Sequence, residues 1–240
     1  MIEIPKTVKR YSDEMIEKLM NVGFFDDVYN LKSHLIGTEI EEEFIERPVK
    51  NIGVWLSGGA DSSLLAYLLC KKVKEENLNV DVMMSTVRRN EKHSHYHSMK
   101  VIEFIEKELD CRVSEHMIHY PDMEDETKFF RETEFEYFNS GLIDVMYSGI
   151  NCNPPESEVP QNDERDRDIS SEKPNKIWWG GGLMMNPFFK LNKREISEVY
   201  KQNNLLNTLL PLTRSCHSDS AEPCGECWWC KEREWGFGDY

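Results

Sequence analysis

The 240-residue sequence lacks any apolar run that approaches the roughly 20 residues of a membrane-spanning helix. Its first residues, MIEIPKTVKRYSDEM, also lack the apolar core of a secretion signal. Basic residues are scarce relative to acidic ones. The sequence has 29 Lys and Arg and 44 Asp and Glu, which gives a formal net charge of −15. This charge repels polyanions and counts against nucleic-acid substrates, but it allows a pocket for one small anion. We therefore expect a cytoplasmic protein without membrane contacts.

Two common phosphate-binding motifs are also missing. The sequence contains neither G-x-x-x-x-G-K-[ST] nor G-x-G-x-x-G. It does contain SGGADSS at residues 57–63, between a strand-like segment and a helical one. Gly58 and Gly59 would let backbone amides approach anionic oxygens, and the start of the following helix supplies further amides and a favourable dipole. The segment is therefore a candidate cradle for the phosphates of a nucleotide.

Side chains of the same segment extend this interpretation. Ser57, Ser62 and Ser63 offer hydroxyl donors. Asp61 fits beside phosphates if a magnesium ion lies between them, or it caps the helix. The alternative without chemistry is a polar strand–helix turn in which Asp61 or Ser62 is only a cap.

Strand-like and helical segments alternate from residue 51 onward. This alternation predicts an α/β fold, with a parallel sheet and helices on both of its faces. Ligands bind such sheets at the carboxyl ends of the strands, where residues 57–63 lie. We expect strands at 52–56, 80–86, 112–120 and 144–149, and helices at 62–74, 97–109 and 124–139.

Three parts of the chain differ in composition. We expect residues 1–48 to form a helical amino-terminal extension, with helices near 12–22 and 25–36, and residues 49–212 to form the nucleotide domain. Residues 213–240 hold a cysteine cluster. Within the nucleotide domain, the polar, proline-bearing segment 152–176 indicates a loop or flexible insertion, with a mobile lid as the alternative.

Seven cysteines cannot all pair within one chain, and four of them stand in the last 25 residues. Their spacing, C-x7-C-x2-C-x2-C, suits a closed tetrahedral zinc site of four thiolates. Disulfides and an iron–sulfur cluster are the alternatives. His217 could replace one ligand, although four cysteines suffice. The predicted zinc ligands are Cys216, Cys224, Cys227 and Cys230.

These motifs carry a resemblance to known families. SGGADSS resembles the pyrophosphatase loop of the PP-loop ATP pyrophosphatases, whose fold is Rossmann-like. Together with the CGECWWC knuckle, it resembles the 7-cyano-7-deazaguanine synthase (QueC) family. YSGINC resembles the family's G-V-N, which places Gly149 and Asn151 at the nucleotide or substrate edge. NPFFKLNKREI resembles its P-L-x-x-L-x-K-x-E-I segment, which makes Lys193 a candidate phosphate-side cation, with an exposed helix lysine as the alternative.

The resemblance implies ATP, Mg²⁺ and Zn²⁺ as cofactors. The implied reaction activates a carboxylate, such as that of 7-carboxy-7-deazaguanine, as an adenylate, and ammonia or another amine then gives an amide or nitrile. Asp61 and Lys193 are the implied catalytic residues, and the zinc is structural. The implied ATP and pyrophosphate contacts are Leu56, Ser57, Gly58, Gly59, Ala60, Asp61, Ser62, Ser63, Gly149 and Asn151.

The sequence also departs from the family. The D-Y-S-G-Y-P-D-C-R-like stretch that helps to define the substrate pocket is replaced by NCNPPESEVPQNDERDRD. A divergent member is therefore expected, and three alternatives stay open. The first is a QueC-like enzyme that attaches a deazaguanine to a protein partner, as in phage or antiviral-defence settings. The second is a tRNA-modifying PP-loop enzyme, and the third is a non-catalytic scaffold that binds nucleotide. A homodimer, or a protein partner bound through the extension, is also compatible with the sequence.

Two polar stretches near the second strand are weaker candidates. His93, His95 and His97 stand at every second position of HSHYH, which favours a solvated polar loop ahead of a helix over a metal site. Arg88 and Arg89 directly follow the strand, where they could meet a phosphate or carboxylate.

Overall fold

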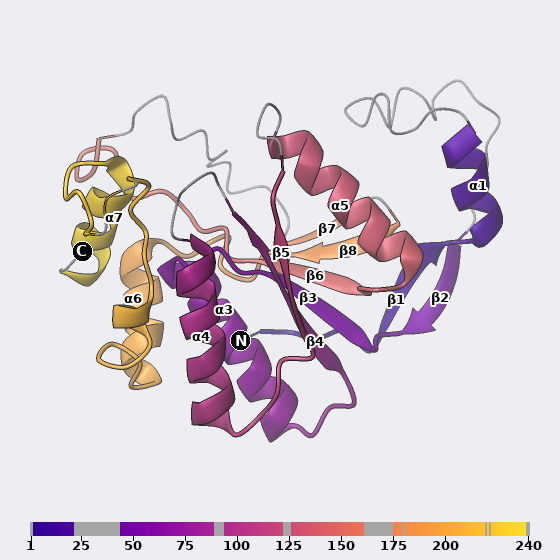
Figure 1. Ribbon diagram of the computed structural model, residues 1–240, viewed down its shortest axis with the longest axis horizontal. Helices are drawn as coiled ribbons and strands as arrows, with labels where there is room; N and C mark the ends of the chain where they lie inside the picture. Colours follow the sequence, from indigo (N-terminus) through magenta and orange to yellow (C-terminus); the bar gives the residue numbers. More distant parts are fainter. Residues whose placement is uncertain are drawn as a thin grey trace.

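A six-stranded sheet forms the centre of the molecule (Figure 1). The computed structural model describes residues 2–21, 44–88, 94–121, 126–160, 175–179, 181–218, 220 and 222–238. Within these residues the sheet has the order β5-β4-β3-β6-β8-β7, and all neighbouring pairs are parallel except β7–β8. The strands are β3 (Asn51–Trp55), β4 (Asp81–Val87), β5 (Glu115–His119), β6 (Val145–Ser148), β7 (Lys176–Trp179) and β8 (Gly182–Met185).

The predicted α/β fold is therefore confirmed, with an antiparallel edge strand as the difference. Strands β7 and β8 were not predicted, because each has only four residues and neither shows a clear alternating pattern. Gly181, with φ +86°, lies in the left-handed region and allows the tight connection between them.

Helices cover both faces of the sheet. Ile52 and Val54 of β3 pack in one core with α3 and α4, whereas Trp55 and Met146 contact a second core that includes residues of α5. Figure 1 shows α3 and α4 on one side of the sheet and α5 on the other. Burial of both faces is typical of parallel sheets. No helix within the described ranges has the length and hydropathy needed to cross a bilayer. The helices are α3 (Ala60–Glu75), α4 (Ser94–Leu109) and α5 (Glu126–Ser140).

The amino-terminal extension is not purely helical, which corrects the prediction for residues 1–48. It contains β1 (Thr7–Tyr11), α1 (Asp13–Asn21) and β2 (Phe44–Pro48), and β1 and β2 pair antiparallel with Tyr11 opposite Phe44. This pairing joins residues more than thirty positions apart in the sequence, which local helical periodicity does not report. The helix predicted at 25–36 lies outside the described residues.

The extension is attached firmly to the sheet. Tyr11 is fully buried, and its ring lies 5.2 Å from the rings of both Phe44 and Trp178. The hydroxyl of Tyr147 in β6 donates a hydrogen bond to the carbonyl oxygen of Glu3 at 2.8 Å. These contacts make the first residues part of the same packed body.

The carboxyl-terminal part returns to the edge where the strands end. It contains α6 (Lys193–Gln202), the short 3₁₀ helix η3 (Leu210–Leu212) and α7 (Trp228–Phe237), and α6 packs against α7. Helix α6 begins with a capping box between Asn192 and Glu195. The hydroxyl of Tyr200 in α6 donates to the carbonyl oxygen of Ala60 at 2.7 Å, which fixes α6 against the start of α3.

Candidate nucleotide-binding site and metal centre

The glycine loop connects β3 to α3. Gly58 has φ +76°, a conformation that favours glycine. The backbone N–H of Ser57 donates to Ser62 Oγ at 3.1 Å, and the two serine hydroxyls lie 3.0 Å apart. Gly59 is the N-cap of α3, and within the described structure no side chain caps the helix. Neither Asp61 nor Ser62 is therefore the predicted cap of this helix, and binding of an anion by its first amides stays a prediction.

Three of the residues predicted to contact the nucleotide are buried in the structure. Leu56 is buried, and its backbone N–H and carbonyl already bond to the carbonyl of Ser85 and the hydroxyl of Thr86. Ala60 is also buried. Ser63 is buried too, and its hydroxyl has no hydrogen-bond partner among the described residues. Contact of these residues with a nucleotide stays a prediction.

Asp61 and Lys193 meet directly across the two helix starts. The Lys193 ammonium contacts Asp61 Oδ2, and it lies 3.3 Å from Glu232 Oε2 of α7. Only 2% of the Lys193 side chain is exposed, so its interpretation as a solvated helix lysine is wrong. Glu232, which is 1% exposed, was missed because nothing in the local sequence distinguishes it from a surface carboxylate.

The residues that follow β6 pack closely against the start of α3, beside Asp61. A Cβ on Gly149 would lie 2.8 Å from the backbone nitrogen of Ser62, so only glycine allows this approach. The side-chain amide of Asn151 donates to Asp61 Oδ1 at 3.4 Å. The structure thus places Gly149 and Asn151 beside the glycine loop, and their contact with nucleotide stays a prediction.

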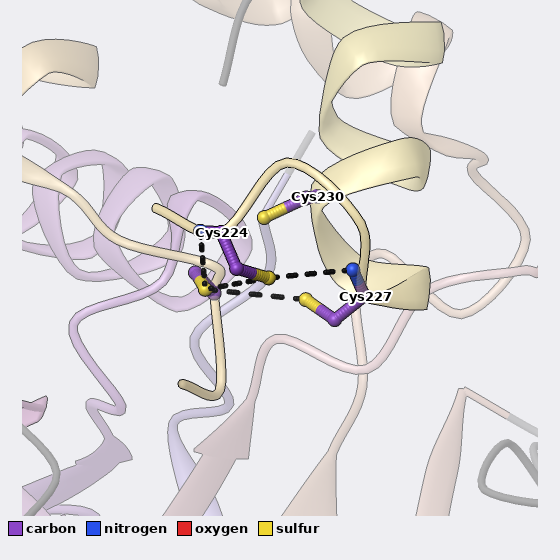
Figure 2. A group of neighbouring side chains, drawn as sticks. Cys224, Cys227 and Cys230 are labelled. Atoms are coloured by element: carbon purple, nitrogen blue, oxygen red, sulfur yellow. Dashed lines mark hydrogen bonds between the residues drawn. The ribbon is translucent and has the colours of Figure 1, made fainter. Parts of the chain in front are cut away.

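The four clustered cysteines form a group that could hold a metal ion. Their Sγ atoms all lie within 4.8 Å of one another, and Figure 2 shows the thiols of Cys224, Cys227 and Cys230 turned toward a common centre. A tetrahedral site with Zn–S bonds of about 2.3 Å needs sulfurs roughly 3.8 Å apart. The Cys216 Sγ lies 3.5 Å from Cys224 Sγ and 4.0 Å from Cys227 Sγ, which fits this spacing.

The cysteines are free thiols, so the disulfide alternative is not observed. His217 does not belong to the group of ligands and stacks on Trp229 with ring centroids 3.6 Å apart. Four thiolates suit zinc or an iron–sulfur cluster, and zinc stays a prediction.

Hydrogen bonds to sulfur lower the pKa of two of the clustered cysteines. Burial raises the pKa of Cys216, but hydrogen bonds from Ser218 and from the backbone N–H of Cys224 outweigh it and lower the pKa to about 6. The backbone N–H groups of Cys227 and Glu226 lower the pKa of Cys224. Burial raises the pKa of Cys230. These shifts favour the thiolate at Cys216 and Cys224 and the neutral thiol at Cys230.

Arg214 connects the cysteine cluster to the glycine loop. Its backbone N–H donates to the carbonyl oxygen of Gly58 at 2.9 Å. Its guanidinium donates to the carbonyl oxygens of Ser218, Ser220 and Glu222, which lie between the first two cysteines. The sequence did not indicate this role.

The polar stretches near β4 lie differently from the prediction. Helix α4 already begins at Ser94, so His95 and His97 are helical and not part of a solvated loop. His95 is buried, and His97 Nδ1 lies 2.8 Å from the carbonyl oxygen of Leu212, because the first turn of α4 packs on η3. Arg88 lies over the ring of Tyr120, 5.4 Å from its centroid. Arg89 and His93 lie outside the described residues.

Comparison with known families agrees with both motifs. The family described as queuosine biosynthesis protein QueC matches residues 182–240, which include α6, the cysteine cluster and α7. The NAD synthase family, a second PP-loop family, matches residues 34–136, which include the glycine loop. Together they support a divergent QueC-like PP-loop ATP pyrophosphatase. Both families indicate ATP-dependent PP-loop chemistry, in which ATP and Mg²⁺ are used.

Solved structures are only distantly similar to this chain. The U34-tRNA thiolase NcsA from Methanococcus maripaludis, solved with its 4Fe–4S cluster, is 15% identical, with a TM-score of 0.43 and 77% of this chain covered. The chain spans 63% of the length of that thiolase. An NAD⁺ synthetase from Burkholderia pseudomallei is 12% identical, with a TM-score of 0.38 and coverage of 95% of this chain and 83% of the synthetase. No protein of curated function matches the sequence.

Proposed function

We propose that this chain uses ATP to adenylate a carboxylate and then joins the activated acyl group to an amine. The observation that carries the proposal is the start of α3, uncapped by any described side chain, beside the pair of buried Lys193 and partly exposed Asp61. The match of residues 182–240 to the QueC family supports a carboxylate as the group that is activated.

The glycine loop would bind the phosphates. The amides at the start of α3 and the hydroxyl of Ser57 would donate to the phosphate oxygens, and the helix dipole favours negative charge there. Negative charge grows on the α-phosphoryl group and on the departing pyrophosphate, so preorganised donors are the main catalytic device.

Asp61 is the residue that would hold the magnesium ion. Its carboxylate is 16% exposed and lies next to the amide of Asn151, and oxygen ligands of this kind suit Mg²⁺. When bound, Mg²⁺ would neutralise phosphate charge. Lys193 supplies a fixed positive charge beside it.

No protein nucleophile is needed for this reaction. A carboxylate oxygen of the substrate attacks the α-phosphorus, and the bond to the bridging oxygen breaks so that pyrophosphate leaves. The amine then attacks the acyl carbon, AMP leaves, and the amine loses a proton. We propose a deazapurine such as 7-carboxy-7-deazaguanine as the carboxylate, because the CGECWWC knuckle and Lys193 resemble the QueC pattern. A zinc ion would hold the knuckle and take no part in the chemistry.

The test is pyrophosphate release and mass-resolved products from protein, ATP, Mg²⁺ and 7-carboxy-7-deazaguanine, with and without ammonium. We expect AMP, pyrophosphate and the amide or nitrile, and an inactive Asp61→Ala variant. Adenylate without amide would support the activation step and redirect the search to another amine. Nucleotide binding without pyrophosphate release for any carboxylate would contradict the proposal and favour a scaffold role.

A protein amine is a second candidate for the acceptor. Tyr120 and Ile150 are exposed just after β5 and β6 end, and Tyr96 and Met99 are exposed in the first two turns of α4. Exposed apolar side chains suit contact with a macromolecule better than contact with ammonia. The test is a mass increase of one deazaguanine acyl group on an added candidate protein in the presence of ATP. An RNA shift assay separates this candidate from a tRNA substrate.

A further inference from the structure

The buried lysine of the site has two anionic partners. Lys193 contacts the carboxylate of Asp61 and lies 3.3 Å from that of Glu232. Lys193 and Glu232 are 2% and 1% exposed, whereas Asp61 is 16% exposed. One ammonium and two carboxylates leave this trio with one net negative charge, and its most accessible oxygens belong to Asp61.

This excess charge matters because buried charges need partners. One carboxylate would already match the Lys193 ammonium, and breaking such a buried pair leaves a costly uncompensated charge. If Asp61 were the sole partner, its transfer to an incoming cation would strand Lys193 in the interior. Glu232 removes this penalty, since it stays beside Lys193 when Asp61 turns to another cation.

The cysteine cluster holds Glu232 in place. Helix α7 starts directly after Cys227, contains Cys230 and carries Glu232 two residues later. The next residue, Arg233, donates to the carbonyl oxygens of Leu210 and Thr213. These contacts fix the position of α7.

Gly236 lets α7 lie against α6. A Cβ at Gly236 would come within 2.2 Å of Lys193 Cγ, so glycine allows the lysine stem to pack closely on α7. The carboxylate is therefore set against Lys193 by a rigid element.

We infer that Glu232 is a positioning residue, which keeps the Lys193 ammonium paired so that Asp61 can bind the magnesium ion of MgATP. The inference rests on the proposed function, because it requires a nucleotide and Mg²⁺ at this site. It assigns a role to the helix that follows the cysteine cluster, since that helix sets the charge of the nucleotide site.

The test is the Mg²⁺ concentration that gives half-maximal binding of α,β-methylene-ATP, measured by calorimetry on the full chain. Glu232→Gln removes the charge and keeps the shape, and we expect the Mg²⁺ midpoint to rise about tenfold. Glu232→Asp keeps the charge but moves it away from Lys193, because the side chain is shorter. Its Mg²⁺ midpoint should lie between those of the wild type and Glu232→Gln. Glu234→Gln removes a charge from an exposed position of the same helix and should leave the midpoint unchanged.

The outcomes separate this inference from the proposed function. A wild-type chain that binds no nucleotide at any Mg²⁺ concentration contradicts both. Wild-type binding with the same midpoint in Glu232→Gln overturns the inference alone, even if that variant melts earlier, because a purely structural role would lower stability without changing the Mg²⁺ requirement. If Glu232→Gln does not fold, Glu232→Asp decides, and a wild-type midpoint in that variant overturns the inference.

Discussion

The backbone N–H of Arg214 donates a hydrogen bond to the carbonyl oxygen of Gly58, 2.9 Å away, so the segment that carries Cys216 is joined directly to the glycine loop. The guanidinium of the same residue holds three carbonyl oxygens between Cys216 and Cys224. Order in the cysteine cluster and order in the glycine loop are therefore coupled through one residue, whose backbone contacts the loop and whose side chain holds the cluster.

Metal removal should consequently weaken nucleotide binding. Without a metal, the four thiols no longer hold residues 216–230 together, and Arg214 loses its carbonyl partners. We expect one metal ion per chain, a melting temperature lower by about 5 °C or more after chelation, and reduced ATP affinity. Metal analysis, thermal unfolding and calorimetry measure the metal content, the melting temperature and the ATP affinity. Added zinc should restore the melting temperature and the affinity. Full ATP affinity in metal-free protein would contradict the coupling.

Gly149→Ala tests the close approach of β6 to the glycine loop. The added methyl group would lie 2.8 Å from the backbone nitrogen of Ser62, so either the loop or the strand end must move. We expect pyrophosphate release to fall by about 100-fold, because small displacements of positioning groups have effects of this size. Gly238→Ala is the comparison for a glycine replacement without a clash, since its Cβ meets nothing within 4 Å; its φ of +79° strains the helix end and costs stability, but this position lies outside the glycine loop. Equal activities of the two variants would show that the approach is not needed.

Lys193→Met separates the structural and chemical roles of the buried lysine. The substitution removes the ammonium that lies 3.3 Å from the buried Glu232 carboxylate, and we expect a loss of about 3 kcal/mol in the free energy of unfolding. Adding Glu232→Leu should recover much of that stability, because apolar residues can replace a buried ion pair. Pyrophosphate release should stay low in the double variant. Urea unfolding and activity assays report the two effects, and recovered activity would exclude Lys193 from catalysis.

Local patterns predicted the fold and the two motifs. The strand–helix alternation, SGGADSS and the spacing of Cys216 to Cys230 are each confined to short segments, and the structure has an element or a cluster at each. The features that were missed depend on contacts between distant parts of the chain. The pairing of β1 with β2 and the contact of Lys193 with Glu232 are of this kind. Neither leaves a periodic signal, so only the folded chain shows them.

Two half-buried histidines should make the stability fall in mild acid. Burial lowers the pKa of both His116 and His119, and their Nε2 atoms lie 2.8 Å from Thr86 Oγ1 and 2.5 Å from the Tyr137 hydroxyl. A lowered pKa means that the unfolded chain takes up protons before the folded chain does as the pH falls. The stabilisation is therefore complete above about pH 6.5, the ordinary histidine pKa, and is lost below it.

Urea unfolding at a series of pH values between 7.5 and 5.5 measures this loss. Carboxylates also contribute to acid unfolding, so the double variant His116→Gln, His119→Gln serves as the reference. We expect its free energy of unfolding to change less over this range than that of the wild type. Parallel curves for the two proteins would show that these histidines do not carry the pH dependence of the free energy of unfolding.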